Sequence, residues 1–542
     1  MKRTLIAFSL LIGIGLLQVS CSKNFDDINT DPNKATESSF DPQLLLPSSQ
    51  FTYANSTYGY NSGILFQSMW VQILASTSTG GANYYSNGDK YRISSNTNSY
   101  VQSVWREGYK AASYAYEMER QTKNNPLYPN VSKIAVIMQI QSIATISDVY
   151  GNVPYSQALK AKDGFFTPKY DSQETLYKAM LSKLDSVVSK LDVAGDKPAY
   201  DAFSYEGDIA KWKKYGYSLM LKLAMRLVKA DPTTAKTYAE KAVAGGVFTS
   251  VEDDAYVMGD QPNNYSNGNA SALIVPADRY EVRWSKTFID YLKATNDIRL
   301  SKVSEVPPNG LHANESAVRG DTTIAKQLGL PNGYDLNGGA TDLTKRTDYP
   351  GSTPAVITPK DTTDQPAVLG KYSRPTALIY SDRNSPLFVL TYAEVALLLA
   401  EAAERGYTVG GTAADFYKKG VSAGIQSLAK FGASATITAA AADAYANAHP
   451  LNSGTALQQI NEQYWVVNGT LFNFVEAWSN WRRSGYPVLT PIDYTGNFSN
   501  STIPRREPYP SNEATQNPQS YQDAVKSLTG GDTWTTRVWW DQ

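Results

Sequence analysis

The chain has 542 residues, of which 42% are hydrophobic and 12% aromatic, and its formal net charge is −1. A balance this close to neutral excludes the strongly basic surface of a nucleic-acid-binding protein. One cysteine and two histidines exclude disulfides and thiolate metal sites, and they leave little basis for a histidine zinc site or a Ser-His-Asp triad. We therefore expect no metal and no cofactor, and carboxylates are the side chains left for catalysis.

Residues 1–20 have the pattern of a secretory signal peptide. Lys2 and Arg3 form a positive start, and the apolar run from Leu5 to Leu17 is shorter than the roughly 20 residues of a membrane span. The run ends just before Cys21, which predicts cleavage at this point and lipidation of the sulfur, as in bacterial lipoproteins. Ordinary secretion with Cys21 as a free thiol is the alternative. Several acyl chains on Cys21 would anchor the chain stably to a membrane.

Residues 22–50 are polar and show no apolar period, so they are expected to be extended, with a lipidated tether over 21–40 and one domain over 41–542. Helical periodicity begins near residue 101. Segment 131–151 is apolar on nearly all sides, which indicates a buried helix that Gly151 and Pro154 end. The expected helices are 101–121, 131–151, 171–192, 209–230, 232–244, 385–406, 411–432 and 457–485.

These helices follow one another as helix–turn–helix units, which predicts a mainly α fold with a tetratricopeptide-like α-solenoid scaffold. Each unit buries its apolar face only by stacking on its neighbours. The repeats are expected at about 101–245 and 385–485. Residues 76–100 are polar and contain four tyrosines, and residues 256–284 and 303–384 are rich in Gly, Pro, Asn and Thr. Loops of this length are usually functional or disordered, and we expect a loop-rich lobe over about 251–384, packed on the scaffold.

Seven strings of the sequence occur together in the order of a known family. They resemble the SusD/RagB-like nutrient-binding outer-membrane lipoproteins of Bacteroidetes, in the branch with an N-terminal NFDDINTDPN string. The strings are CSKNFDDINTDPNKAT, DVYGNVPYSQAL, WKKYGYSLMLKLAMRLV, LTYAEVALLLAEAAERG, FVEAWSNWRRSGYPVLTP, IPRREPYPSNE and RVWWD.

The resemblance implies a non-catalytic lipoprotein anchored in the outer membrane and facing the cell exterior. Its partner would be a TonB-dependent, SusC-like barrel transporter. The lipoprotein would capture an oligosaccharide or an oligopeptide and close over the barrel as a lid. A surface glycoside hydrolase that works through two carboxylates, and a scaffold without a ligand, are the alternatives.

Two aromatic and amide-rich loops are the candidate binding surface. Tyr and Trp rings can stack on the C–H face of a sugar, while amide and charged groups bind its hydroxyls. Convergence of the loops would form an aromatic cleft with a polar rim. Alternatively, these tyrosines pack their own loops. The candidates are Asn83, Tyr84, Tyr85, Asn87, Asp89, Tyr91 and Arg92 in the first loop, and Asn263, Asn264, Tyr265, Tyr280, Arg283 and Trp284 in the second.

Other conspicuous residues are interpreted as structural. Arg482 and Arg483 are expected near a helix C-terminus that Gly485 and Pro487 end. Glutamates 394, 401 and 404 fall on one helical face and are expected to pair with arginines such as Arg405 or with polar groups inside the solenoid. The Trp539–Trp540 pair is expected to dock the C-terminal segment onto the body.

Overall fold

The computed structural model describes residues 40–57, 59–79, 85–308, 318–353 and 367–542. The chain divides into two units, Met1–Pro42 and Gln43–Gln542, and the fold described below is that of the second. The predicted signal peptide, the lipidation site Cys21 and nearly all of the predicted tether lie outside the described residues.

The first group of long helices packs in chain order. α3 and α7 both pack against α6, and α7 to α10 follow one another, each against the next. These helices are α3 (Leu45–Thr57), α6 (Thr97–Thr122), α7 (Pro129–Tyr150), α8 (Gln173–Val188), α9 (Ile209–Arg226) and α10 (Pro232–Gly245).

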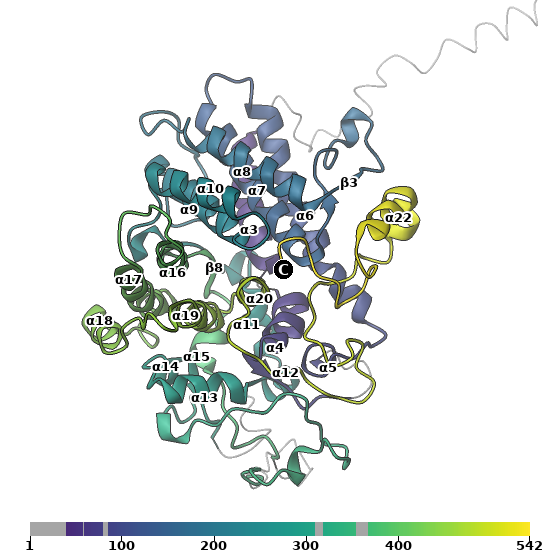
Figure 1. Ribbon diagram of the computed structural model, residues 1–542, viewed down its shortest axis with the longest axis vertical. Coiled ribbons are helices and arrows are strands. Elements are labelled where there is room, and N and C mark those ends of the chain that lie inside the picture. The colour runs from purple at the N-terminus through teal and green to yellow at the C-terminus, as the bar shows by residue number, and fades with distance from the viewer. Residues whose placement is uncertain (1–39, 58, 80–84, 309–317, 354–366) are drawn as a thin grey trace, which may run out of the picture. The chain divides into compact units, whose positions relative to one another are not determined.

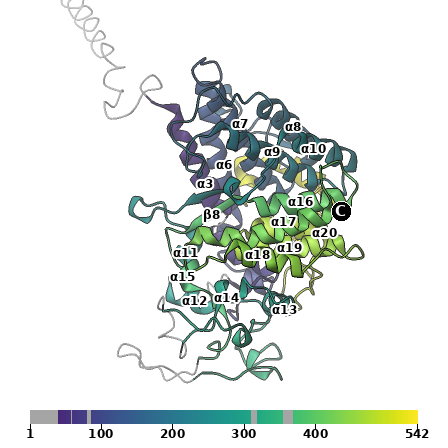
Figure 2. The same cartoon turned by 90° about the vertical axis from the view of Figure 1, so that its left-hand side faces the viewer.

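A second group of helices continues this packing. α16 packs on both α17 and α9, and thereby joins the two groups, while α19 packs on α16 and α20. Figures 1 and 2 show this group between α8–α10 and α12–α14. The prediction of a mainly helical fold built from paired helices is confirmed. The group consists of α16 (Tyr392–Glu404), α17 (Ala413–Gln426), α18 (Ala439–Ala448), α19 (Ala456–Thr470) and α20 (Phe474–Ser484).

The remaining described residues form short elements. Four antiparallel two-stranded sheets are formed by β1 (Leu74–Ala75) with β5 (Arg283–Trp284), β2 (Val153–Pro154) with β3 (Tyr170–Asp171), β4 (Ala255–Met258) with β8 (Pro386–Leu390), and β6 (Ser304–Glu305) with β7 (Arg374–Pro375). All but the β2–β3 sheet join segments that are distant in sequence. The short α-helices are α4 (Ser68–Trp70), α5 (Tyr85–Asp89), α11 (Gly268–Leu273), α12 (Pro276–Glu281), α13 (Lys286–Ala294), α14 (Leu300–Val303), α15 (Ala377–Tyr380), α21 (Glu513–Gln516) and α22 (Pro518–Ser527).

Single helical turns and one π-helix complete the structure. The π-helix η2 (Tyr60–Gln67) leads into α4. The 3₁₀ turns are η1 (Pro42–Leu44), η3 (Ala161–Asp163), η4 (Val251–Asp253), η5 (Gln261–Asn263), η7 (Ile324–Lys326), η8 (Leu343–Lys345) and η9 (Ser427–Phe431).

Aromatic side chains join the C-terminal segment to the helices. Trp70 packs between Trp478 of α20 and Trp534, with ring centres 5.0 and 5.9 Å away. Trp540 is fully buried, and its indole N–H donates to Asp148 of α7 over 3.1 Å. The expected docking of the C-terminal segment onto the body is therefore confirmed.

Helix boundaries follow the capping signals of the sequence. Ser172 accepts the N–H of Thr175 at the start of α8, and Pro232 occupies the first turn of α10. Gly151, with φ of +86°, follows α7 in a conformation that a residue with a Cβ rarely adopts.

The predicted helix 385–406 is wrong at its start, because residues 386–390 are strand β8. This segment is apolar and fully buried, and it pairs with β4, where Phe388 lies opposite Tyr256. Thr391 then forms a capping box with Glu394, so the helix begins only at Tyr392.

The predicted segment 457–485 is two helices with a sharp turn between them. Phe472 has a φ of +61°, which ends helical geometry, and Asn473 caps α20 by accepting the N–H of Glu476. Gly485 ends α20 as expected, in the left-handed conformation.

The expectation of an extended chain over 22–50 is wrong from residue 42 onward, where the 3₁₀ turn η1 leads directly into α3. The buried face of this helix mixes Leu46, Tyr53 and Ala54 with polar side chains, so the sequence shows no continuous apolar stripe. Ser49 donates to the carbonyl of Ala111 over 2.8 Å, and the Gln50 amide donates to Asp201 over 2.7 Å.

Candidate functional site

A pocket of about 470 Å³ opens among α3, α6 and the turn that precedes α11, a size typical of small-ligand sites. Aromatic rings, amides and a few charged groups share its lining. We call it the Tyr265 pocket. Its lining residues are Ser48, Phe51, Thr52, Asn55, Gly59, Tyr60, Asn61, Ser103, Arg106, Glu107, Lys110, Tyr114, Asn264, Tyr265 and Gly268.

A tight turn presents two of the predicted residues in this pocket. The backbones of Asp260 and Tyr265 exchange hydrogen bonds of 2.7 and 2.8 Å, and Asn264 takes the left-handed conformation, with φ of +65°. The Tyr265 ring is 49% exposed and packs edge-on against Phe51, with ring centres 4.9 Å apart. A half-exposed ring held by another ring can stack on an apolar ligand face.

The two predicted loops converge behind the pocket wall. Asp278 of α12 accepts hydrogen bonds from both Tyr60, over 3.0 Å, and Tyr85, over 2.6 Å. The two tyrosine rings lie edge to face with centres 6.2 Å apart. Burial raises the pKa of Tyr85 well above its usual value, so its hydroxyl remains a donor. Tyr85 therefore supports Tyr60, which lines the pocket, from inside the protein.

The charged rim of the pocket comes from one face of α6. Arg106 pairs with Glu107 over 2.8 Å, and Lys110 lies 3.9 Å from the same carboxylate. Glu107 is the single carboxylate residue among the described lining residues. A glycoside hydrolase needs two carboxylates across the scissile bond, and the described lining does not provide them.

A second pocket, of about 570 Å³, lies beside residues 331–346 and 490–493. We call it the Tyr334 pocket, because Tyr334 lines it with the Arg346 guanidinium 4.5 Å from the ring centre. The predicted residue Asp89 is buried behind its wall. The Asp89 carboxylate accepts from the side chain of Asn332 over 2.8 Å and from the N–H of Gly333 over 2.9 Å.

The neighbours of Asp89 also support this second wall. The guanidinium of Arg92 lies 5.9 Å from the ring centre of Tyr494, whose hydroxyl donates to Asp335 over 2.6 Å. Tyr91 is fully buried, and its carbonyl accepts the N–H of Phe498 over 2.7 Å. Asp89, Tyr91 and Arg92 therefore lie with the Tyr334 pocket and not with the Tyr265 pocket.

The predicted residues at the end of the second loop face the core instead of a cleft. Trp284 is fully buried and stacks on Phe288 with ring centres 5.1 Å apart. Arg283 is 1% exposed and donates to the carbonyl of Val282 over 3.0 Å, and its guanidinium lies 5.4 Å from the Tyr280 ring centre. Neighbouring parts of the fold thus occupy the ring faces and polar groups that a ligand would need. Asn83 and Tyr84 lie outside the described residues.

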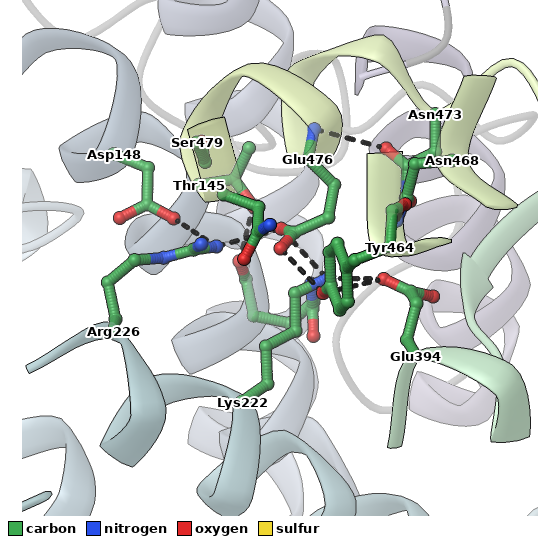
Figure 3. Close-up of polar contacts among 12 residues, drawn as sticks. Thr145, Asp148, Lys222, Arg226, Glu394, Tyr464, Asn468, Asn473, Glu476 and Ser479 are labelled. Carbon is green, nitrogen blue, oxygen red and sulfur yellow. Dashed lines mark hydrogen bonds and ion pairs between the residues drawn. The ribbon is translucent and has the colours of Figure 1, made fainter. Parts of the chain in front are cut away.

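A network of charged side chains crosses the helical core away from both pockets. Figure 3 shows Lys222 between Glu394 and Glu476, at 3.3 and 3.0 Å, and Arg226 between Asp148 and Glu476, at 3.2 and 2.8 Å. Burial alone would raise the pKa of Glu476, but the two cations lower it to about 2. This carboxylate is thus fixed in its charged form, which suits a structural role.

Glu401 and the arginines in the last turn of α20 behave as expected from the sequence, whereas Glu404 is exposed at the surface and does not lie inside the solenoid. Glu401 is buried and receives two 2.7 Å hydrogen bonds from Arg483 and an ion pair of 2.9 Å from Arg405. Arg482 lies over Trp478, with its guanidinium 3.5 Å from the ring centre. Among the described residues, no cluster of three or more His, Cys, Asp or Glu side chains is arranged to hold a metal ion.

Sequence reasoning missed three rings of the Tyr265 pocket: Phe51, Tyr60 and Tyr114. A signal was present for two of them, because residues 51–63 read FTYANSTYGYNSG and share the aromatic and amide-rich composition of the two predicted loops. Tyr114 belongs to a regular helix, and nothing in its local sequence separates it from core tyrosines.

The chain is similar to one protein-family model and to several proteins of known structure. A family model described as starch-binding and associating with the outer membrane matches residues 32–510. The solved structure of a chitin-binding protein is 31% identical, with a TM-score of 0.75, over 93% of this chain and 100% of that chain. A SusD-like protein of Bacteroidetes is 24% identical, with a TM-score of 0.77, over the same shares.

More distant likeness supports the fold. A chitin-binding SusD homologue from Flavobacterium johnsoniae is 22% identical, with a TM-score of 0.69, over 92% of this chain and 98% of that chain. None of the curated proteins matches. In the described part of the chain, no helix has the length and apolarity to cross a membrane. The family model spans most of the sequence, so the chain belongs to the SusD-like family of outer-membrane-associated glycan-binding proteins, which are not enzymes.

Proposed function

We propose that this protein captures an oligosaccharide at the cell surface and delivers it to a partner TonB-dependent, SusC-like barrel transporter, over which it closes as a lid. The ligand would bind in the Tyr265 pocket. Lipidation of Cys21 would anchor the chain in the outer membrane, facing the cell exterior.

The exposed Tyr265 ring, held edge-on by Phe51 in a pocket with amide walls, is the observation that carries this proposal. A sugar would place its C–H face on the ring, while Asn61 and Asn264 are within the same lining to bind its hydroxyl groups. The pocket is open and its charges are confined to one rim. A chitin-binding protein that is 31% identical supports a carbohydrate as the ligand, with N-acetylglucosamine oligomers as the first to test.

Calorimetric titration of the purified protein with chito-oligosaccharides and malto-oligosaccharides tests the ligand class. Replacing Tyr265→Ala is expected to weaken binding roughly tenfold, about 1.4 kcal/mol, because the stacking face is lost. Tyr265→Phe keeps the ring and should retain most of the affinity. Since the ring is half exposed, neither change should unfold the protein.

The matched control is Tyr334→Ala, which removes a ring from the second pocket. If Tyr265→Ala binds glycan as tightly as the wild type and Tyr334→Ala loses affinity, the binding site is the Tyr334 pocket. Binding of an oligopeptide mixture with no affinity for any glycan would replace the carbohydrate by a peptide ligand.

Anchoring is tested separately with Cys21→Ser in the full chain. The variant should lose labelled palmitate and appear as folded protein in the soluble fraction, and nutrient uptake should stop. A variant that stays fully membrane-bound would contradict the anchor. Because the pocket is untouched, glycan affinity in this variant should equal that of the wild type.

A further inference from the structure

Two adjacent phenylalanine side chains protrude from the loop between β2 and β3. Phe166 is 78% exposed and Phe165 is 41% exposed, and no other phenylalanine in the described part of the chain is as exposed. The 3₁₀ turn η3 precedes them, and Gly164 then takes a left-handed conformation, with φ of +89°. We call Phe165 and Phe166 the aromatic knob. Exposed aromatic residues that are clustered, unlike those scattered singly, mark an interaction site.

The base of the knob is well fixed. The Asp171 carboxylate accepts the N–H groups of Tyr155 and Ser156, each over 2.8 Å. Tyr170 donates to Glu513 over 2.6 Å and packs against Tyr509, with ring centres 5.2 Å apart. Figure 1 shows β3 beside α22, in the C-terminal part of the chain. A loop held at both ends loses less conformational entropy on binding than a free one.

A concave pocket adjoins the knob. It has a volume of about 480 Å³, and its lining includes Lys160 and Asp163, which precede the knob in the same loop. Arg120, Lys123 and Lys183 also line it, against Glu119 as the further acid. Arg120 is paired with Glu117 over 2.6 Å, so the three lysines supply the excess of positive charge. The same surface thus combines an apolar projection with a hollow of net positive charge.

We infer that the knob and this pocket form the docking surface for the barrel transporter, an inference that depends on the proposed function. A lipid surface would accept the two phenylalanines, but fluid lipid has no fixed shape to match a hollow beside them. A protein can match both, with an apolar cavity for Phe166 and acidic side chains for the cationic pocket. Aromatic anchors inside a polar rim are the usual centre of such interfaces.

Affinity purification of the tagged full chain from detergent-solubilised native outer membranes tests the inference. The measured quantity is the molar ratio of a TonB-dependent barrel transporter, identified by mass spectrometry, to the tagged chain. The double variant Phe165→Ser/Phe166→Ser should lower this ratio at least tenfold. Lys160→Glu/Lys183→Glu should also lower it, because the charge of the hollow is reversed. Val488→Ser, which changes a 79% exposed apolar residue elsewhere, is the matched control and should leave the ratio unchanged.

The outcomes separate this inference from the proposed function. If no barrel transporter accompanies the wild type, the proposed partner is wrong and the inference is overturned with it. If the transporter accompanies the wild type and the double variant equally, the partner stands and the docking surface is wrong. Sedimentation of the Cys21→Ser chain with phosphatidylglycerol vesicles is a further measurement. Vesicle binding that needs the two phenylalanines would assign the knob to lipid and overturn protein docking. Unchanged glycan affinity in the variants confirms that they are folded.

Discussion

The helical groups and the loop-rich segment from η4 to β7 both contain buried ion pairs, such as Arg374 with Glu305 at 2.9 Å in the second, but the loop-rich segment also uses buried side chains to pair its irregular backbone. In the helical groups, backbone groups bond one another, and the buried charges meet across helices. Lys222 and Arg226 of α9 both contact Glu476 of α20, at 3.0 and 2.8 Å. These ion pairs join helices whose backbone hydrogen bonds are already formed within each helix.

In the loop-rich segment, buried side chains bond the backbone itself. Gln327 is 1% exposed, and its amide donates to the carbonyls of Asp321 and Thr323, at 2.8 and 3.1 Å. Its oxygen accepts from the hydroxyls of Ser304 and Ser373, both at 2.8 Å. Irregular backbone leaves N–H and C=O groups that no ladder pairs, so side chains must pair them. The difference teaches that buried polar residues link whole helices in one region, and that in the other they also take the place of secondary structure.

The largest expected effect comes from breaking the charge network. Glu476→Gln removes the shared partner of two buried cations, Lys222 and Arg226, and should lower the free energy of unfolding by roughly 3–5 kcal/mol. Urea denaturation followed by circular dichroism measures it. The matched control is Glu174→Gln, since Glu174 pairs with Lys178 at the surface over 2.7 Å and should change stability by less than about 0.5 kcal/mol. Equal effects in the two variants would contradict the structural role of the network.

A buried carboxyl whose pKa is raised in spite of nearby cations sharpens the comparison. Burial raises the pKa of Glu507 to about 8, although hydrogen bonds, such as the one from Gln67 at 2.5 Å, and the charges of Arg482 and Arg506 oppose this. Folding therefore takes up a proton at Glu507, and this group lowers stability as the pH rises from about 4.5 to about 8. The pH dependence of stability that Glu476 contributes has the opposite sign. Because its pKa is lowered to about 2, its stabilisation is lost as the pH falls below about 4.5.

Glu507→Gln should remove the pH dependence that Glu507 contributes. At pH 8 the variant is expected to be more stable than the wild type by roughly 2–4 kcal/mol. At pH 4 the wild-type group is protonated in both the folded and the unfolded state, so the two proteins should be equally stable. Urea titrations at both pH values measure this. A wild type as stable as the variant at pH 8 would show that Glu507 ionises normally in the folded protein.

The smallest of the three effects is expected in the loop-rich segment. Gln327→Leu leaves two carbonyls and two hydroxyls without their buried partner and should cost roughly 2 kcal/mol. The loss should be local, so amide hydrogen exchange should accelerate in 318–330 and 369–376 but not in α7 or α9. Gln519→Leu on the exposed face of α22 is the control. Faster exchange throughout the helices would mean that the two regions unfold together.

Most of the helical architecture could be predicted from the sequence, because apolar spacing and caps are local signals. Segment 131–151 is the clearest case, because a helix that is apolar on nearly all sides is followed directly by its final glycine and then by a proline. Helix α3 could not be predicted in this way. Its buried face includes Ser49 and Gln50, whose partners Ala111 and Asp201 are distant in sequence.

The candidate site could be predicted only in part, because composition does not say which face of a loop is covered. Tyr265 and Trp284 looked alike in the sequence, yet one is half exposed and the other is fully buried against Phe288. The difference depends on strand β5, in which Trp284 pairs with Leu74 of β1 and is thereby placed in the core. Such a pairing between residues so distant along the chain has no local signal.

The placement of the tryptophans determines what intrinsic fluorescence can report. All ten tryptophans lie in the described part of the chain, and none of them lines the Tyr265 pocket. The indole rings of Trp70, Trp478 and Trp534 pack together in the core, so emission will follow unfolding and remain silent when a sugar enters that pocket. A change of tryptophan emission on adding a glycan would therefore signal a rearrangement of the helices and not contact with the ligand.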